Sequence, residues 1–375
     1  MVTIRLGIVG LGTAGAAMLG AAFGHDGVTV AAVADTDIGS LRVEDPGAPR
    51  QYDSFDRLLD DDRLDAIYIA TPTPAHFGQV LRALEAGRHV VVEKPVTATY
   101  AEAAELAARA AAFDRIVIVG HSEAFEPYVR AVRHAIADGL IGPPAMVISE
   151  KHTNWMRRPR LPEEWDAAAG GGLIRRQGVH QVDVLRSVLG PGPGLTVREA
   201  RTRPDPERGG PGSYFAWLTR SDGGAAFLTH DGIGRLSKAG AGDAGDRANG
   251  GDADEEAAKR ARRHALARRV LRDRSAVRLG AADSGRLLVF GRDGEILAST
   301  QNAEVSSGAG RRRLDLAAFP EGRHAVLDEL AGAVAGTSDV IHDLAWGRES
   351  LRICEEIERA ALNRGIGNIY RATKF

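Results

Sequence analysis

Short apolar runs alternate with helical stretches over the first third of the chain. Ile4 to Val9 and Val28 to Ala34 are typical of strands buried in a parallel sheet, and a small-residue helix ending at Ala22 is expected between them. Repeated units of this kind predict an α/β fold with a doubly wound parallel sheet and right-handed crossovers. The further helices and strands are expected at Phe55–Leu59 (helix), Ala66–Ala70 (strand), Ala75–Ala86 (helix), His89–Val92 (strand), Ala101–Phe113 (helix) and Ile116–Val119 (strand).

The pattern changes near Gly120-His121. A helix is expected first, and then short strand-like segments are separated by turns and loops, which is typical of a mostly antiparallel sheet. We therefore expect two domains, residues 1–121 with the parallel sheet and residues 122–375 with the second sheet. The expected elements of the second domain are helices at Tyr128–Asp138, Val326–Ala335 and Leu344–Asn363, and strands around Met146–His152, Ser213–Thr219, Ala225–Thr229 and Leu287–Phe290.

One segment of the second domain has an unusual composition. Residues 237–274 are rich in glycine, alanine and aspartate and then strongly charged. Such a segment has few apolar residues to anchor a core, so we expect a solvated helix and a flexible insert. An acidic-then-basic surface for an oligomer partner is the alternative.

A glycine-rich turn joins the first strand to the first helix. Gly10 permits a tight turn, Gly12 lets the backbone approach a pyrophosphate, and Gly15 lets the helix pack closely on the strand. The start of a helix also presents N–H groups and the positive end of its dipole to phosphates. This arrangement predicts a site for a nicotinamide or flavin dinucleotide. The motif reads Gly10-Leu11-Gly12-Thr13-Ala14-Gly15.

Asp35 follows the second strand and bears on the choice of cofactor. A carboxylate there accepts hydrogen bonds from the ribose hydroxyls of NAD and repels the 2′-phosphate of NADP. No arginine adjoins Asp35, and Arg42 is the nearest downstream. NAD is therefore favoured over NADP. The alternative is that Asp35 only caps the next turn.

The composition limits the classes of partner and the cellular compartment that we expect for this protein. The net charge is −2 over 375 residues, which gives no indication of a nucleic-acid or membrane partner. The single cysteine, Cys354, has no second cysteine for a disulfide, and we expect no metal site. The chain starts directly with a strand, so no signal peptide is expected and the predicted location is the cytoplasm.

Two further motifs carry reactive side chains. Glu93-Lys94-Pro95 follows the strand at His89 to Val92, and strand ends are where an open parallel sheet binds ligands. Burial or a neighbouring cation would prepare the Lys94 amine for proton transfer. The run from Gly170-Gly171-Gly172 to His180 and Asp183 places the last two three residues apart, on one helical face. We expect Asp183 to orient His180, although a structural histidine in the core is the alternative.

In this order the motifs resemble those of the Gfo/Idh/MocA oxidoreductases, which are named for glucose–fructose oxidoreductase and inositol dehydrogenase. The resemblance implies a Rossmann domain followed by an α/β domain whose large open sheet forms a homodimer or homotetramer interface. It also implies that Lys94 and His180 lie beside the nicotinamide, in proton transfer and substrate orientation. It implies that the cofactor is lined by Thr71, Pro72, His76 and Glu93.

One position departs from the sugar and inositol members of that family. They carry an aspartate four residues before the motif histidine, where this chain has Arg176. A guanidinium suits a substrate carboxylate, and further basic residues at Arg175, Lys151 and Arg157 to Arg160 strengthen the expectation of an anionic substrate.

The run Lys151 to Arg160, followed by Gly170-Gly171-Gly172 and Arg176-Gln177-Gly178-Val179-His180-Gln181, resembles the branch of phthalate 4,5-cis-dihydrodiol dehydrogenases, and the later Ile341-His342-Asp343 to Trp346-Gly347 is also similar. The resemblance implies that Arg176, Gln177, Lys94 and His180 contact substrate.

These features predict an NAD-dependent dehydrogenase of a secondary alcohol, with a carboxylated cyclic diol as substrate. Lys94 or His180 would remove the hydroxyl proton while the carbinol carbon passes a hydride to the nicotinamide. A sugar or cyclitol dehydrogenase is the first alternative, with Arg176 turned away from the substrate. A non-catalytic NAD-binding sensor is the second, although a sensor has no chemical need of Lys94 or His180.

Overall fold

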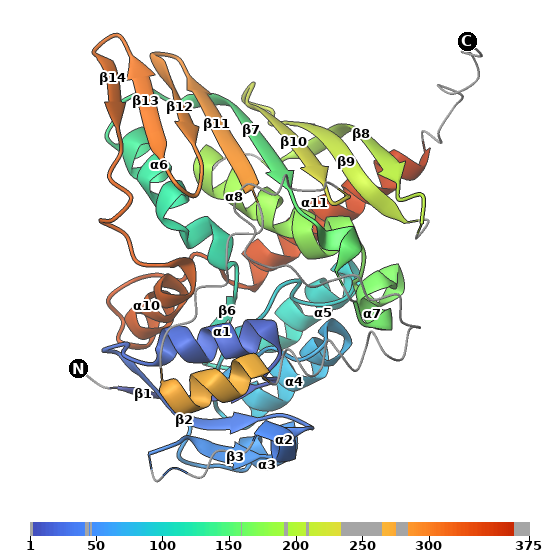
Figure 1. Ribbon diagram of the computed structural model, residues 1–375, viewed down its shortest axis with the longest axis vertical. Coiled ribbons are helices and arrows are strands. Elements are labelled where there is room, and N and C mark those ends of the chain that lie inside the picture. Colours follow the sequence, from blue (N-terminus) through green and yellow to red (C-terminus); the bar gives the residue numbers. More distant parts are fainter. Residues whose placement is uncertain are drawn as a thin grey trace.

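The computed structural model describes residues 3–41, 45, 47–158, 160–190, 194–207, 210–233, 265–274 and 284–363. These residues form a six-stranded parallel sheet at one end of the molecule and an eight-stranded sheet at the other, with helices between them (Figure 1). The predicted α/β architecture, a doubly wound sheet followed by a mostly antiparallel one, is confirmed.

The first sheet is parallel throughout and has the order β3-β2-β1-β4-β5-β6. The apolar residues of its central strands are buried, as expected for a parallel sheet with helices on both faces. The strand order reverses between β1 and β4, and ligands bind at the carboxyl ends of strands at such a point. The strands are β1 Ile4–Val9, β2 Val28–Ala34, β3 Arg50–Tyr52, β4 Ala66–Ile69, β5 His89–Val92 and β6 Val117–Val119.

Local signals in the sequence account for the helices of this half. The Thr99 side chain caps α5 by accepting a hydrogen bond from the Glu102 N–H, and Ser54 caps α3 in the same way through Arg57. After α4, Gly87 has φ +72°, a left-handed conformation that stops a helix. The helices are α1 Thr13–Ala22, α2 Ile38–Leu41, α3 Phe55–Leu59, α4 Thr73–Glu85 and α5 Tyr100–Ala110.

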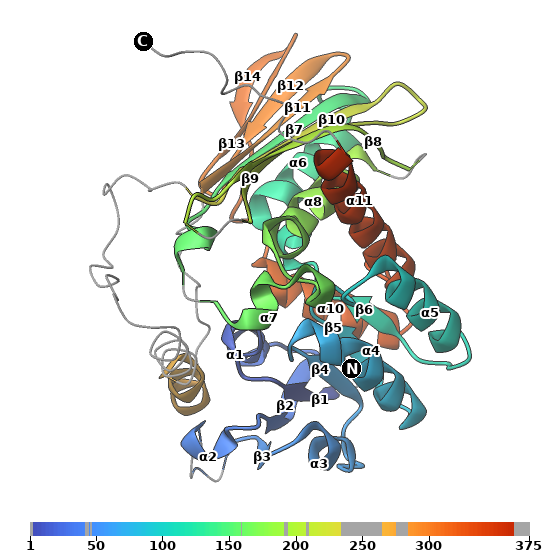
Figure 2. The ribbon, with the colours of Figure 1, turned by 90° about the vertical axis from the view of Figure 1, so that its right-hand side faces the viewer.

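The second sheet has the order β14-β13-β12-β11-β7-β10-β9-β8, and only β7 and β10 pair in parallel. Helices α6, α8 and α11 cover one face, and Figure 2 shows the opposite face without a covering helix. That open face carries the stacked rings of Phe215, Phe227 and Trp217. The strands are β7 Pro144–His152, β8 Thr196–Pro204, β9 Pro211–Thr219, β10 Ala225–Asp231, β11 Ser284–Gly291, β12 Gly294–Ala298, β13 Ala303–Ser307 and β14 Gly310–Arg313.

Short helical turns connect the two sheets. A π-helical turn, η4, runs directly into α8, so the residues before His180 are wound more widely than an α-helix. The helices of this half are η1 Ser122–Phe125, α6 Pro127–Ala137, η2 Trp155–Arg157, α7 Pro162–Trp165, η3 Ala167–Ala169, η4 Ile174–Gly178, α8 Val179–Leu189, α10 Gly322–Val334 and α11 Leu344–Asn363.

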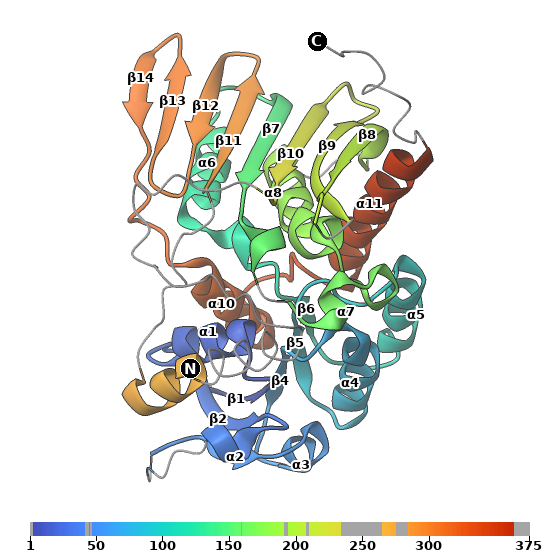
Figure 3. The ribbon, with the colours of Figure 1, turned by 45° about the vertical axis from the view of Figure 1, so that its right-hand side comes forward.

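Two segments from the second half pack on the first sheet. Helix α10 lies against α1, and its Val326 and Leu330 belong to the same apolar core as β1 (Figure 3). Residues 265–273 form a helix whose Ala267, Val270 and Leu271 are fully buried in that core. The expectation of a flexible, solvated insert is therefore wrong for these residues, because three apolar side chains on one helical face suffice to anchor them. Residues 237–264 lie outside the described part.

No helix in the described part of the chain combines the length and the apolar character that a membrane span requires.

Candidate active site

The glycine turn closes against the neighbouring strand end, at the reversal of strand order. Gly10 has φ +84°, and a Cβ there would lie 2.6 Å from the Ala70 carbonyl oxygen. A Cβ on Gly15 would lie 1.8 Å from the carbonyl oxygen of Gly10. Both positions therefore require glycine, as the motif predicts.

The start of α1 suits a dinucleotide. Gly12 is the N-cap residue and has no side chain to cap the helix, and the first turn contains no acid. The N–H groups at Thr13 and Ala14 therefore lie in the uncapped first turn, where a pyrophosphate is stabilised. The residues present thus fit the phosphate part of the predicted cofactor.

The Asp35 carboxylate orders the turn on which this site depends. One oxygen accepts a hydrogen bond of 2.7 Å from the Leu11 N–H, and the other accepts one of 3.0 Å from the Asp37 N–H. The second bond is the turn cap that the sequence offered as an alternative role. Both bonds hold the carboxylate at the end of β2, next to the glycine turn.

His76 ties together the segments that follow β4 and β5. Its Nε2 lies 2.9 Å from the carbonyl oxygen of Thr71, and its Nδ1 lies 3.0 Å from that of Pro95. Burial lowers its pKa, although the two carbonyl contacts oppose that shift. Pro72 is the N-cap residue of α4. These residues thus shape the loops at the predicted cofactor site, and their contact with a cofactor remains a prediction.

Glu93 is buried directly after β5. It accepts hydrogen bonds from the Tyr68 hydroxyl and, at 3.3 Å, from the Lys94 N–H. Its carboxylate therefore holds the backbone from which the Lys94 side chain projects.

Lys94 connects the two halves of the site. Its ammonium group donates a hydrogen bond of 3.1 Å to the carbonyl oxygen of Arg176, in η4. Burial, assisted by the charges of Arg176 and Lys151, lowers the pKa of Lys94 to about 8, against the opposing effects of Glu93 and Glu123. An amine with such a pKa is partly neutral at physiological pH, as a proton acceptor must be.

His180, in the first turn of α8, is held as a neutral ring. It is 7% exposed, and burial followed by the charges of Lys94 and Lys151 places its pKa well below the usual value. The nearest acid is Glu123 of η1, whose Oε1 lies 3.7 Å from His180 Nδ1. The same Oε1 accepts a hydrogen bond of 2.6 Å from Lys151 on β7.

The prediction that Asp183 orients His180 is not supported by the contacts of Asp183. Its carboxylate accepts a hydrogen bond of 2.6 Å from Trp346 Nε1 and lies 3.5 Å from His342 Nε2 and 3.8 Å from His121 Nδ1. The spacing of three residues predicted that His180 and Asp183 share one helical face. The Asp183 carboxylate nevertheless contacts groups from distant segments of the chain, which the fold brings next to α8.

The histidines around Asp183 differ in protonation. Burial opposes the charged form of His342, but Asp183 and Glu329 raise its pKa to about 9. Burial lowers the pKa of His121 to about 4. The result is a buried ion-pair network of His342 with two carboxylates, next to a neutral His121.

The arginines of the motif region are engaged with protein groups. Arg175 Nε pairs with Glu358 at 2.8 Å, and Arg157 pairs with Asp205 at 2.9 Å. Arg176 has a longer contact of 3.5 Å with Glu164. Gln177 is half-buried beside it. Among these arginines, Arg176 is the one whose backbone also contacts Lys94.

Several site residues were not predicted as such, and their positions explain why. Glu123 lies four residues beyond β6, so the rule that strand ends carry ligands could have identified it. His342 and Trp346 arrive from the segment before α11 and the start of that helix, far along the chain, and no local pattern ties them to α8. Lys151 was noted only as one of several basic residues.

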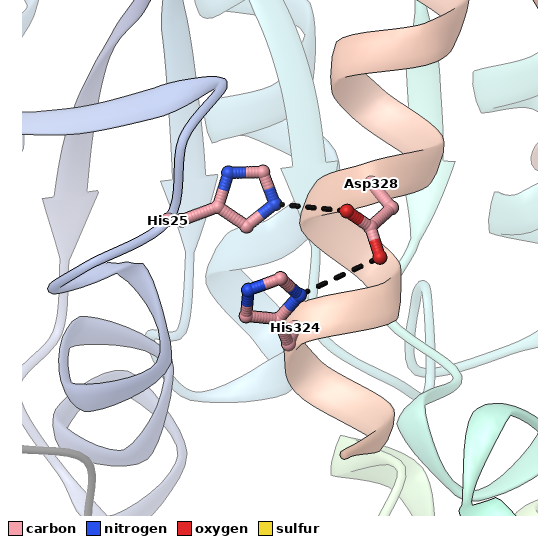
Figure 4. A group of neighbouring side chains, drawn as sticks. All are labelled: His25, His324 and Asp328. Atoms are coloured by element: carbon pink, nitrogen blue, oxygen red, sulfur yellow. Dashed lines mark hydrogen bonds and ion pairs between the residues drawn. The ribbon is translucent and has the colours of Figure 1, made fainter. Parts of the chain in front are cut away.

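A separate cluster brings together His25, His324 and Asp328, at the loop after α1 and on α10 (Figure 4). His25 Nε2 lies 3.2 Å from Asp328, and the Gly27 N–H donates a hydrogen bond of 3.0 Å to His25 Nδ1. Because Nδ1 is the acceptor, Nε2 carries the proton of the neutral ring and is not a metal ligand. The cluster therefore serves as a hydrogen-bonded contact between α10 and the first domain.

The glycine turn at the strand reversal, with a lysine after β5 and a neutral histidine in the first turn of α8, defines a dinucleotide-dependent oxidoreductase. Two family models agree. The oxidoreductase family with an NAD-binding Rossmann fold matches residues 4–121, and the GFO/IDH/MocA C-terminal domain matches residues 129–231. The chain belongs to the Gfo/Idh/MocA family of oxidoreductases, which confirms the resemblance seen in its motifs.

Individual relatives cover the chain to different extents. A 1-carboxy-3-chloro-3,4-dihydroxycyclohexa-1,5-diene dehydrogenase from Comamonas testosteroni is 28% identical over 380 residues, which cover 94% of this chain and 93% of the relative. An inositol 2-dehydrogenase from Rhodococcus erythropolis is 32% identical over 193 residues, or 50% of this chain and 53% of the relative. The crystal structure of an oxidoreductase from Agrobacterium radiobacter in complex with NAD⁺, L-tartaric acid and magnesium shares the fold, with a TM-score of 0.71, 16% identity and coverage of 96% and 97% of the two chains.

Proposed function

We propose that this protein is an NAD-dependent dehydrogenase that oxidises a secondary alcohol of a carboxylated cyclic diol, such as a phthalate cis-dihydrodiol. The observation that carries the proposal is the hydrogen bond from Lys94 to the Arg176 carbonyl. It joins the end of β5 to the turn that leads into His180, and the two groups are close enough for the charge of Lys94 to lower the pKa of His180.

In this proposal some residues bind the cofactor and others accept the proton of the substrate hydroxyl. NAD, when bound, supplies the hydride acceptor. The turn from Gly10 to Gly15 would bind the pyrophosphate, and Asp35 would accept hydrogen bonds from the ribose hydroxyls, which favours NAD over NADP. Lys94 or His180 would accept the proton of the substrate hydroxyl, since each has a population of its neutral form.

The charge around Lys94 supports an anionic substrate. Lys94, Lys151 and Arg176 are close enough for the two neighbours to lower the pKa of Lys94. Three basic groups in one site favour a substrate carboxylate, which would take the place of Glu164 at Arg176. The full-length relative from Comamonas testosteroni, named for a carboxylated cyclohexadiene diol, supports the same substrate class.

A sugar or cyclitol dehydrogenase is the second candidate. The contact between Arg176 and Glu164 favours it, because a guanidinium that stays paired leaves no cation for a carboxylate. The two candidates differ in the effect of Arg176→Gln. NADH formation would be measured on carboxylated cis-diols and on inositol and aldoses. Turnover confined to the carboxylated diols, and lost in Arg176→Gln, supports the first candidate, whereas unchanged turnover of neutral polyols supports the second.

We further infer a homo-oligomer in the cytoplasm. The uncovered face of the second sheet exposes 38% of Trp217 and 48% of Leu297, and apolar patches of this kind are typical of interfaces between subunits. The buried thiol of Cys354 is compatible with a reducing compartment. Sedimentation velocity of the wild type and Trp217→Glu tests the interface, since a charge on this apolar face should yield the monomer.

A further inference from the structure

Glu123 is the acid that faces His180. It lies in η1, directly beyond the carboxyl end of β6, and 28% of its side chain is exposed. Its Oε1 is 2.6 Å from Lys151 Nζ and 3.7 Å from His180 Nδ1. The first distance is a charge-assisted hydrogen bond. The second is longer than a hydrogen bond, and such contacts at active sites often shorten when substrate binds.

The Nδ1 atom of His180 is buried and has no hydrogen-bond partner among the described residues. Asp183, on the same helix, is engaged with Trp346 and His342 instead. The groups whose charges act most on His180 are cations or a second imidazole, and none of them is an anion that would accept a charge-assisted hydrogen bond from Nδ1–H. These groups are Lys94 after β5, Lys151 on β7, His121 before η1 and Arg323 on α10.

We propose that Glu123 is a positioning residue for His180, which it orients and holds in one tautomer, and that Lys151 anchors it in this role. The Nδ1–H then points at the carboxylate, and the Nε2 lone pair is left for the substrate hydroxyl. With His180, rather than Lys94, as the base, breaking the hydroxyl O–H bond transfers the proton to Nε2 and leaves the electron pair on the substrate oxygen. The imidazolium that results lies beside the negative charge of Glu123. The inference rests on the proposed function.

The first test compares Glu123→Gln with Glu150→Gln. Glu150 precedes Lys151 on β7, and because side chains alternate along a strand, its side chain points to the other face of the sheet. Glu150→Gln therefore removes the same charge as Glu123→Gln without changing a contact of His180. In Glu123→Gln we expect kcat to fall roughly a hundredfold with little change in KM, within the range that a positioned base contributes. Because Glu123 also raises the pKa of Lys94, the pH–rate limb should move to lower pH.

A second measurement does not depend on turnover. The ring-nitrogen chemical shifts of ¹⁵N-histidine-labelled protein report the tautomer of His180, whose signals are assigned by their loss in His180→Asn. We expect the Nδ1–H tautomer in the wild type and a loss of this preference in Glu123→Gln. An Nε2–H tautomer in the wild type, or equal kinetics for the Glu123 and Glu150 variants, overturns the inference. If no alcohol reduces NAD, the proposed function fails, while the tautomer still decides the role of Glu123.

Discussion

The amine of Lys94 is expected to set the pH dependence of alcohol oxidation. Burial lowers its pKa to about 8, with Glu93 opposing and Arg176 assisting this shift. An amine accepts a proton only in its neutral form, so turnover by the wild type should rise with pH through this range. Lys94→Arg keeps a positive charge but cannot be deprotonated at any working pH.

The size of the effect follows from the pKa. With a pKa of about 8, the neutral fraction is roughly one tenth at pH 7 and roughly nine tenths at pH 9, so kcat/KM, which reports the enzyme before substrate binds, should rise about tenfold between them. Lys94→Arg should lose this limb, and its kcat/KM should fall by about 10²–10⁴, the usual contribution of a general base. Its affinity for NAD should change little, since the glycine turn is intact.

The assay is the initial rate of NADH formation with the diol well below its KM, between pH 6 and pH 10, for the wild type and Lys94→Arg. NAD binding is measured separately by quenching of tryptophan fluorescence. A variant that keeps the limb and turns over within about tenfold of the wild type would show that another group, such as His180, accepts the proton.

Three further predictions concern binding and stability. Gly15→Ala places a Cβ 1.8 Å from the Gly10 carbonyl oxygen, so NAD titration should show lost affinity, and retained affinity would mean that the turn does not bind the cofactor. The raised pKa of His342, about 9, stabilises the fold fully below its unfolded value of about 6.5, and this contribution is lost as pH rises through about 9. Urea unfolding of the wild type and Asp183→Asn should therefore differ most at neutral pH and below, and a constant difference up to pH 10 would contradict the pairing. Leu271→Ala should lower the free energy of unfolding by about 2–5 kcal/mol, because Leu271 is fully buried. A decrease below about 0.5 kcal/mol would contradict the packing of residues 265–273 in the core.

The sequence pattern predicted every strand of the first sheet except β3, because each of the others is a continuous apolar run with a clear boundary. The bounds of β1, β2 and β5 coincide with the expected ones. The edge strand β3 was missed because Arg50–Tyr52 is three residues long and mostly polar. The strand β14 was missed because all four of its residues are exposed, so no alternation of burial marks it.

The site was predictable where its residues share a local motif. The glycine turn and the lysine after β5 each have a sequence signature tied to their strand. The partners of His180 and Asp183 have none, because Glu123 and His342 reach them through the packing of separate segments. A spacing of three residues predicts a shared helical face, but the neighbouring elements decide which group on that face meets which partner.

The most direct measurement is the rate of NADH formation, followed by its near-ultraviolet absorbance, when the purified protein is mixed with NAD and a carboxylated cis-diol. The rate is compared between the undeuterated diol and the diol deuterated at both carbinol carbons. Hydride transfer from a carbinol carbon predicts NADH formation, a slower rate with the deuterated diol and deuterium in the reduced cofactor. It also predicts that the variant with both Lys94→Ala and His180→Ala binds NAD but forms no NADH. Tight NAD binding with no reduction by any carboxylated diol or neutral polyol would contradict the assignment as a dehydrogenase and identify a protein that only binds the cofactor.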